Sequence, residues 1–438
     1  MKKFGIIALA ALLVFAFTMP AAAVENIFGG YFRVRAWTQQ NFTGEDTSEL
    51  MDLSNVDQRT RLYYTAKFSD DFKFVNKFEF DMDWGKDGDF GVDFKGMEIK
   101  HSYVDFNLGP VNLKLGAQGA AIARGFIFAD DFAGAVVTYK GEGYTVPFYW
   151  LRAYEGGYET QPPLTDQNDA DFDYFGIAPK FNMGDATIQP MLVAVMSDEA
   201  GGFNPLIHAY PFYGVPVGAD AEDLDVYFLG LNADFKLGDA SLWFTGIYET
   251  GEIDWEDGSS ADIDAFLVAF GGNTSIGGTG VHGQAFYATG QDLTSSTDDL
   301  ETFWVPSDSM WRGQSYYWAE IMGYGTFDDD YSMGAPGDKI SNIMAGNVGV
   351  SFKATDNLKV TADLWYAKLA EEDILGNDEL GFELDLKATL KLMDNLNLDV
   401  VGAYLFAGDA TNIVAELVPS VTSDADPWLV GTRLSLSF

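Results

Sequence analysis

The chain contains 438 residues and no cysteine, which excludes disulfides, thiol chemistry and cysteine-based metal sites. It carries 66 acidic against 26 basic residues, a formal net charge of −40, so it cannot bind nucleic acid through the phosphates. Aromatic residues make up 15% of the chain and 47 residues are glycine, a composition that favours strands joined by turns. The 47% hydrophobic content argues against a disordered chain.

The first residues predict an export signal. Lys2 and Lys3 form a positive n-region, an apolar stretch runs from Phe4 to Met19, and Ala21–Ala23 form a small-residue cleavage site. The apolar stretch is shorter than the roughly 20 residues that a helix needs to cross a bilayer. We therefore expect residues 1–23 to be a cleaved signal peptide. Residues 24–438 show no linker or plug, so we expect them to form one domain.

Many segments of the mature chain alternate between apolar and polar side chains. Between Leu380 and Leu392 every second residue is apolar, while Glu383 and Asp385 have the opposite parity. Strands of soluble sheets average five or six residues, whereas the strands of a membrane barrel alternate for about ten. The pattern predicts eighteen strands, at 30–38, 57–68, 72–83, 98–108, 111–119, 133–140, 143–154, 172–182, 186–196, 223–236, 240–250, 261–271, 279–290, 346–354, 358–369, 379–392, 396–407 and 427–438. Sixteen strands is the alternative.

The connections between these strands support a barrel. Short turns alternate strictly with longer connections. The short turns are 69–71, 109–110, 141–142, 184–185, 238–239, 272–278, 355–357 and 394–395. Such alternation is typical of a transmembrane barrel with tight periplasmic turns and long external loops. The pattern predicts an all-β, antiparallel up-and-down barrel with both termini on the periplasmic side.

The end of the chain carries a resemblance. The segment from Asp426 to Phe438 alternates, and its apolar residues share one parity: Trp428, Val430, Leu434, Leu436 and Phe438. A final strand that ends in phenylalanine resembles the closing strand of bacterial outer-membrane barrels. In that family the terminal aromatic residue belongs to the signal that the barrel-assembly machinery reads, a role that the resemblance implies for Phe438.

Taken together, the leader, the alternating strands, the loop pattern and Phe438 resemble Gram-negative outer-membrane porins. The resemblance implies a homotrimer in the outer membrane, in contact with its lipid, through which small hydrophilic solutes and ions diffuse passively. A barrel of sixteen to eighteen strands leaves an aqueous channel, whereas eight strands would be filled by side chains. The sequence reveals neither the natural solute nor the net ion selectivity.

The basic residues of several strands share the inward parity. Arginine on the lipid face costs a few kcal/mol near the midplane, so the energy also favours the lumen. These residues predict a basic stripe on one wall of the pore: Arg33, Arg35, Arg59, Arg61, Lys73, Lys77, Lys114 and Arg433.

Two connections are candidates for the constriction. The first runs from Ala120 to Phe132 and carries Arg124, Asp130 and Asp131, so its carboxylates would stand against the basic stripe and produce a transverse field. The competitor is the long connection 291–345. It is rich in aromatic residues that would pack as a lid, stack on sugar rings or mediate subunit contacts: Trp304, Trp311, Tyr316, Tyr317, Trp318, Tyr324 and Tyr331.

Acidic residues concentrate in the long connections, for example at 166–173, 252–264 and 328–330. They hydrate the outer rim, and a negative vestibule concentrates cations by focusing the field. Clustered carboxylates can also bind Ca²⁺ or Mg²⁺, but no EF-hand spacing is present. We therefore expect no cofactor beyond loosely held divalent ions at these loops.

An enzyme is the less favoured reading. Outer-membrane barrels include lipases and proteases, yet the three histidines, His101, His208 and His282, show neither a paired metal spacing nor a nucleophile motif. A purely structural or adhesive barrel is the second alternative. Lipase or protease assays would test the first, and single-channel conductance the second.

Overall fold

The computed structural model describes residues 24–42, 52–85, 92–154, 172–198, 221–255, 258–292, 299–305, 316–327, 340–373, 375–412 and 425–438. The expected signal peptide and parts of the long connections, including His208, lie outside these residues. In this part of the chain, no helix is long and apolar enough to cross a bilayer.

The described chain is almost entirely antiparallel β-sheet that closes on itself, because β1 pairs with both β2 and β19. β8 and β9 form one interrupted strand, since both pair with β7 and with β10. Pro179 lies in the gap between them and has no N–H to donate, which accounts for the break. The predicted closed barrel of 18 strands is therefore confirmed.

The bounds of the elements are as follows. The first half of the described sheet contains β1 Glu25–Gln40, β2 Leu53–Ser69, β3 Phe72–Trp84, β4 Val92–Leu108, β5 Val111–Ile122, β6 Phe128–Lys140, β7 Tyr144–Tyr154, β8 Phe172–Ile177, β9 Lys180–Met183 and β10 Ala186–Asp198. The second half contains β11 Ala221–Leu237, β12 Ala240–Trp255, β13 Ser260–Ile276, β14 Thr279–Ala288, β15 Ile343–Thr355, β16 Leu358–Leu369, β17 Glu379–Met393, β18 Leu396–Ala407 and β19 Trp428–Ser437. Two short 3₁₀ turns, η2 Ala123–Gly125 and η3 Asp409–Asn412, complete the description.

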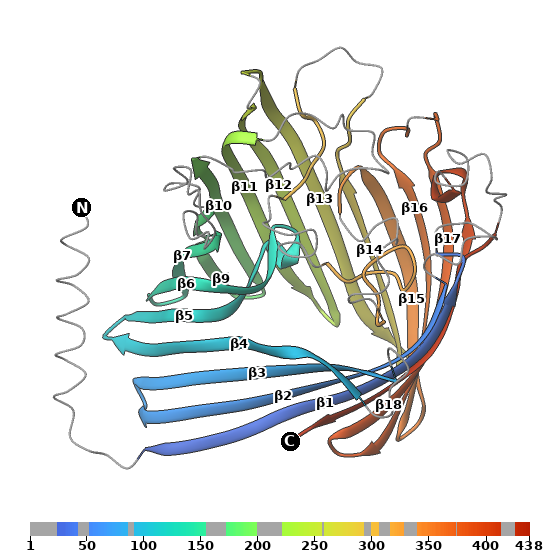
Figure 1. Ribbon diagram of the computed structural model, residues 1–438, viewed down its shortest axis with the longest axis horizontal. Helices are drawn as coiled ribbons and strands as arrows, with labels where there is room; N and C mark the ends of the chain where they lie inside the picture. The colour runs from blue at the N-terminus through green and yellow to red at the C-terminus, as the bar shows by residue number, and fades with distance from the viewer. Residues whose placement is uncertain are drawn as a thin grey trace.

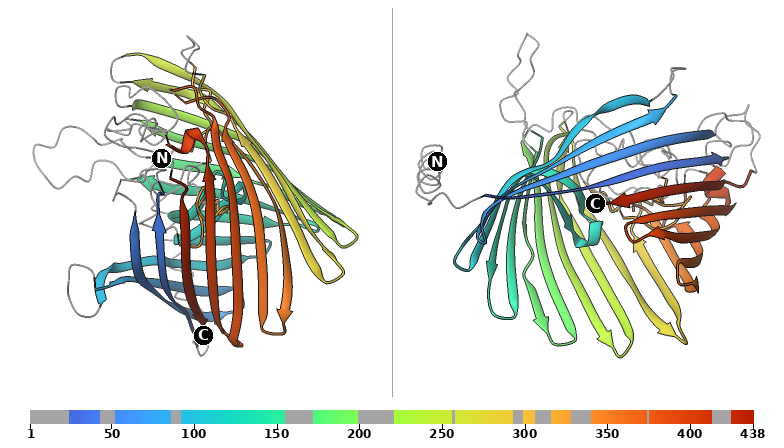
Figure 2. Two further views of the ribbon diagram at one scale, coloured as in Figure 1. Left: turned by 90° about the vertical axis from the view of Figure 1, so that its right-hand side faces the viewer. Right: turned by 90° about the horizontal axis from the view of Figure 1, so that it is seen from below.

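The first and last strands lie side by side (Figures 1 and 2). Phe438 extends their pairing: Gly30 N donates to Phe438 O at 2.7 Å, and Phe438 N donates to Gly30 O at 3.1 Å. The terminal ring lies over Gly30, where a Cβ atom would come within 2.3 Å of it. Phe438 thus takes part in closing the barrel, and its role in assembly stays a prediction.

The predicted alternation of short and long connections is confirmed, with two adjustments. The stretch 272–278 is strand as far as Ile276, so the turn is only Gly277 and Gly278. The expected loop from Ala120 to Phe132 is mostly paired strand, because β5 and β6 pair up to Ile122 and Phe128. Only residues 123–127 form the tip of this hairpin.

The outer face of the barrel carries large exposed apolar side chains. On β17, Phe382 and Leu384 are exposed, whereas Glu383 between them is fully buried. The same parity holds on β2, where Leu62 is exposed. An apolar outer belt of this kind is the lipid-facing surface of a transmembrane barrel.

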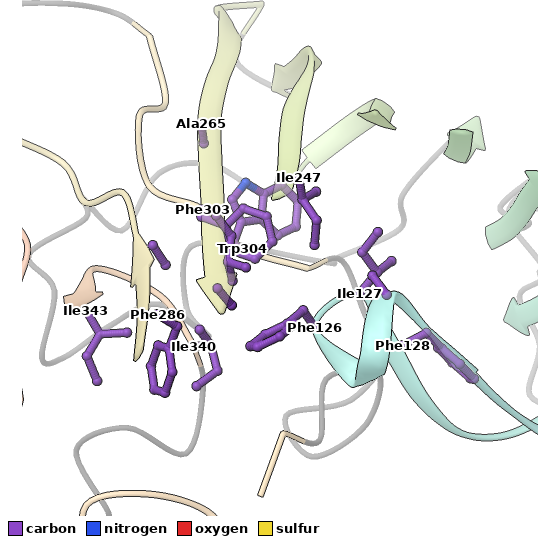
Figure 3. Close-up of a cluster of buried hydrophobic side chains, with 14 of the residues drawn as sticks. Phe126, Ile127, Phe128, Ile247, Ala265, Phe286, Phe303, Trp304, Ile340 and Ile343 are labelled. Atoms are coloured by element: carbon purple, nitrogen blue, oxygen red, sulfur yellow. The ribbon is translucent and has the colours of Figure 1, made fainter. Parts of the chain in front are cut away.

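Many inward side chains of β10 to β14 do not face water. They are apolar and buried, among them Val193, Val195, Leu224, Val226, Phe228, Ile263 and Leu267. They are buried because chain segments fold into the barrel and pack on them. Phe126, Ile127, Phe303 and Trp304 come from these segments and join Ile247 and Phe286 of the wall in one cluster (Figure 3).

Candidate solute pathway in the barrel lumen

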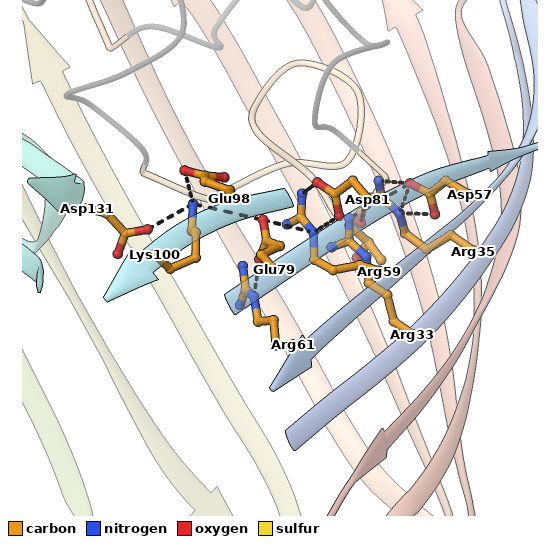
Figure 4. Close-up of polar contacts among 11 residues, drawn as sticks. Arg33, Arg35, Asp57, Arg59, Arg61, Glu79, Asp81, Glu98, Lys100 and Asp131 are labelled. Carbon is orange, nitrogen blue, oxygen red and sulfur yellow. Dashed lines mark hydrogen bonds and ion pairs between the residues drawn. The ribbon is translucent and has the colours of Figure 1, made fainter. Parts of the chain in front are cut away.

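One wall of the lumen carries a row of ion pairs between β1 and β4, which we call the ladder (Figure 4). Arg59 donates from Nε and Nη2 to the two oxygens of Asp81, each at 2.6 Å. Arg59 Nε also lies 3.2 Å from Glu79 Oε1, and Arg61 bonds the other oxygen of Glu79. The strand register causes this pattern, because Arg59 lies opposite Asp81 and Arg61 lies opposite Glu79. Each arginine of β2 therefore faces a carboxylate.

The ladder continues into a buried pair on β1 and β2. Arg35 is only 1% exposed, and its Nε lies 3.0 Å from both oxygens of Asp57. Its Nη1 donates to the backbone oxygen of Thr326 at 3.1 Å. Arg33 Nη2 lies 3.8 Å from the same Asp57. Arg35 thus holds a loop residue against the wall instead of lining open space.

A β-bulge brings Lys100 into the ladder. The register between β3 and β4 passes from His101 directly to Ile99, so Lys100 is the extra residue. Lys100 Nζ lies 2.9 Å from Asp131 Oδ2, and His101 Nε2 lies 3.2 Å from Asp131 Oδ1. Strict alternation cannot reveal Lys100, because the bulge breaks the two-residue period.

The carboxylates of the β5–β6 hairpin do not stand across the pore from the basic residues. Asp131 lies beside the ladder, bound to Lys100 and His101, and Asp130 accepts a hydrogen bond from the Asp131 N–H at 2.7 Å. The other predicted basic residues also have partners: Lys73 lies 3.2 Å from Asp105, Lys77 6.0 Å from the Tyr63 ring and Lys114 5.8 Å from the Tyr103 ring, and Arg433 donates to Asp399 at 2.8 Å. The wall therefore carries both signs of charge.

The tip of the β5–β6 hairpin reaches the opposite wall. Arg124 has a φ of 61°, and its Nη2 donates to Asp234 Oδ1 on β11 at 2.8 Å. Its Nε donates to Thr245 Oγ1 on β12 at 3.1 Å, and its guanidinium lies 5.2 Å from the centre of the Trp243 ring. Phe126, two residues further on, is fully buried. Arg124 therefore anchors the tip to the far wall.

A second segment, residues 316–327 of the long connection 291–345, also lies inside the barrel. The N–H groups of Ile321 and Met322 each donate to a carboxylate oxygen of the buried Glu383 at 2.7 Å. Phe327 stacks on Trp37 of β1 with 5.7 Å between ring centroids. We call residues 316–327 the inward segment. Its anchors lie on β17 and β1.

The tip of the β5–β6 hairpin and the inward segment meet at a pair of stacked rings. The centroids of Phe126 and Tyr316 lie 4.0 Å apart at an interplanar angle of 22°. Tyr316 donates its hydroxyl to Gln284 Oε1 at 2.8 Å. Burial raises the pKa of Tyr316 to about 12, so the hydroxyl stays a neutral donor at physiological pH. Both loops predicted as constriction candidates thus have residues inside the barrel that contact each other.

The aromatic residues of the connection 291–345 have different surroundings. Trp304 is buried, Tyr316 and Trp318 pack within the lumen, and Tyr317 is exposed, with its ring 4.4 Å from that of Tyr324. Trp311 and Tyr331 lie outside the described residues.

In the described chain, no group of three or more His, Asp or Glu side chains is arranged to hold a metal ion.

No protein-family model matches the sequence, and no curated protein matches it. Solved structures do. OpdK of Pseudomonas aeruginosa, solved with vanillate, has 11% identity and a TM-score of 0.57 over 94% of this chain and 98% of its own. OccAB1 of Acinetobacter baumannii has 11% identity and a TM-score of 0.57 over 94% and 97%. OccK8 (OprE) of Pseudomonas aeruginosa has 10% identity and a TM-score of 0.58 over 94% and 98%.

The fold is that of the outer-membrane Occ barrels. The likeness covers nearly the whole of each chain. At about one residue in ten identical, it establishes the architecture and transfers no binding residue.

Proposed function

We propose that this chain is a diffusion channel in the outer membrane of a Gram-negative bacterium that selects small hydrophilic solutes. One observation carries the proposal. Phe126 of the hairpin tip stacks on Tyr316 of the inward segment inside the barrel, while ladder residues on the other wall stay partly exposed, with 25% of the Arg61 side chain accessible. A barrel of this size holds an aqueous channel unless segments fold into it. The remaining path therefore runs beside a wall of paired charges.

One further observation supports a channel. OpdK, which has the same fold, was solved with vanillate, a small molecule. Cleavage after Ala23, a homotrimer and recognition of Phe438 by the assembly machinery belong to the same proposal.

A planar-bilayer recording of the purified, folded protein tests it. We expect discrete, long-lived conductance steps and a reversal potential in a salt gradient. A folded barrel that inserts without conducting would favour the structural or adhesive alternative. Mass spectrometry of the mature chain and cross-linking in the membrane would test the cleavage site and the trimer.

A further inference from the structure

A cavity of about 350 Å³ lies in the lumen against strands β12 to β18, with Trp318 and Glu320 of the inward segment among its lining residues. Its wall residues Asn273, His282 and Thr361 come from the parts of their strands close to the short turns. The volume is at the lower end of the range for small-molecule sites. The ladder contributes none of the residues that line it.

The floor of the cavity is a preorganised polar network. His282 Nε2 lies 2.7 Å from Asp363 Oδ1, and Asn347 Nδ2 donates to the same oxygen at 2.7 Å. His282 and Asp363 belong to β14 and β16, which are separated by β15. They meet over Gly349, where a Cβ atom would come within 2.2 Å of Asp363 Oδ1 and 2.3 Å of His282 Nε2. A glycine at this place is therefore required for the contact.

Three indole rings lie around this floor. Trp243 projects from β12, Trp365 from β16 and Trp318 from the inward segment. Trp318 and Trp365 pack edge to face, with 5.2 Å between centroids. Indole faces offer a large apolar surface at small entropic cost, and their edges offer an N–H donor.

One side of the cavity is lined by Asp385, which is 7% exposed. Its Oδ2 accepts the Glu320 N–H at 3.4 Å, and its buried Oδ1 lies beside the carboxyl group of Glu383 on the same strand. Asp385 therefore helps to hold Glu320 of the inward segment at the cavity wall.

The charges of the lining do not favour anions. Glu320 and Asp363 face the ammonium of Lys387, and Asp363 is bonded to His282. Hydroxyl groups both donate and accept, which suits carboxylates beside the amides of Asn347 and Gln284. Aromatic faces suit the C–H surface of a sugar ring.

We propose that this cavity is a binding subsite for a neutral polyhydroxylated solute, such as a monosaccharide, on its way through the channel. The inference rests on the proposed channel function. Binding is nevertheless measurable without transport, so the two can fail separately.

The test uses the full mature protein in detergent, with D-glucose as the probe and saturation-transfer NMR as the readout. We expect saturable binding that Gly349→Ala weakens about ten-fold, because the methyl group separates His282 from Asp363. The atoms it meets are the ends of side chains, so the fold should tolerate it. Trp243→Leu should weaken binding independently. Trp84→Phe is the control, because Trp84 is an exposed tryptophan at the end of β3 that does not line the cavity. This variant should bind glucose normally.

Benzoate and arginine serve as anionic and cationic probes in the same assay. Preferential binding of either with the same dependence on Gly349 and Trp243 would overturn the sugar-like class. Glucose binding that neither variant changes would overturn the site. Ion conductance without glucose binding would overturn this inference and leave the channel standing, whereas glucose binding without conductance would support the subsite and remove the channel.

Discussion

The two sides of the lumen bury their inner faces in different ways. On the ladder side, each arginine of β2 bonds a carboxylate of β3, so the charged side chains satisfy one another within the wall. On the side formed by β10 to β14, much of the inner face is apolar, and Phe126 and Phe303 of the folded-in segments pack on it. The same barrel thus contains a charged wall and a small hydrophobic core.

This difference explains where the hairpin tip and the folded-in parts of the connection 291–345 lie. Apolar burial contributes about 25 cal/mol per Å² removed from water, which favours docking on β10 to β14. Covering the ladder would instead require charges to lose water, which costs several kcal/mol per ion. Among the described residues, the inward segment contacts the ladder at Arg35, where Asp57 and the carbonyl of Thr326 satisfy the guanidinium. Arg61 and Asp81 of the ladder stay partly exposed.

The largest expected effect comes from breaking the contact of the inward segment with Arg35. Arg35→Met leaves the buried Asp57 without its bidentate partner, so we expect the free energy of unfolding to fall by about 3–5 kcal/mol. Urea unfolding in micelles measures it. Arg59→Met is the matched control, because its partner Asp81 is 30% exposed to water and its other partner, Glu79, keeps its bond to Arg61. Equal losses in the two variants would show that burial does not distinguish Arg35 from the rest of the ladder.

The next largest effect concerns the contact between the hairpin tip and the inward segment. Phe126→Ala removes the ring stacked on Tyr316, and truncating a fully buried phenylalanine costs about 3–5 kcal/mol of local packing. We expect the hairpin tip to loosen and single-channel conductance to rise about two-fold, since the lumen widens beside the ladder. Phe148→Ala, on the exposed outer face, should leave conductance unchanged. Unchanged conductance in both variants would place the narrowest point elsewhere.

The sequence predicts the barrel well because alternation is a property of each strand alone. On β17 the exposed Leu384 and the buried Glu383 reveal the two faces without knowledge of the neighbours. The ladder depends on more than one strand: Arg61 and Glu79 share an inward parity, but only the register of β2 and β3 makes them partners. The bulge at Lys100 has no signature in the alternation.

The sequence does not predict the inward apolar faces, for a different reason. In β11, Leu224, Val226 and Phe228 point inward and are buried, whereas Asp223 and Asp225 alternate with them on the other face. Alternation alone would place these apolar side chains toward lipid. Their burial depends on loop segments far along the chain. The contact between Glu383 and the N–H of Ile321 likewise joins residues 62 positions apart.

The smallest expected effect comes from substitutions that test whether the ladder selects ions although its charges are paired. Converting Arg59 and Arg61 to glutamine leaves Asp81 and Glu79 uncompensated beside the path, so the reversal potential in a salt gradient should shift toward cations. Adding the same change at Arg33, which faces Asp57, should extend the shift. The converse pair, Asp81→Asn with Glu79→Gln, should shift it toward anions by a similar amount.

Opposite shifts of similar size are the outcome that distinguishes a paired wall from a purely basic stripe. With a purely basic stripe, removing the arginines would shift the reversal potential strongly toward cations, whereas removing the carboxylates would change it much less. High salt should diminish both shifts, because the Debye length falls to about 3 Å at 1 M and partly exposed charges are then screened. A reversal potential that neither pair of substitutions moves at low salt would mean that ions pass outside the reach of the ladder.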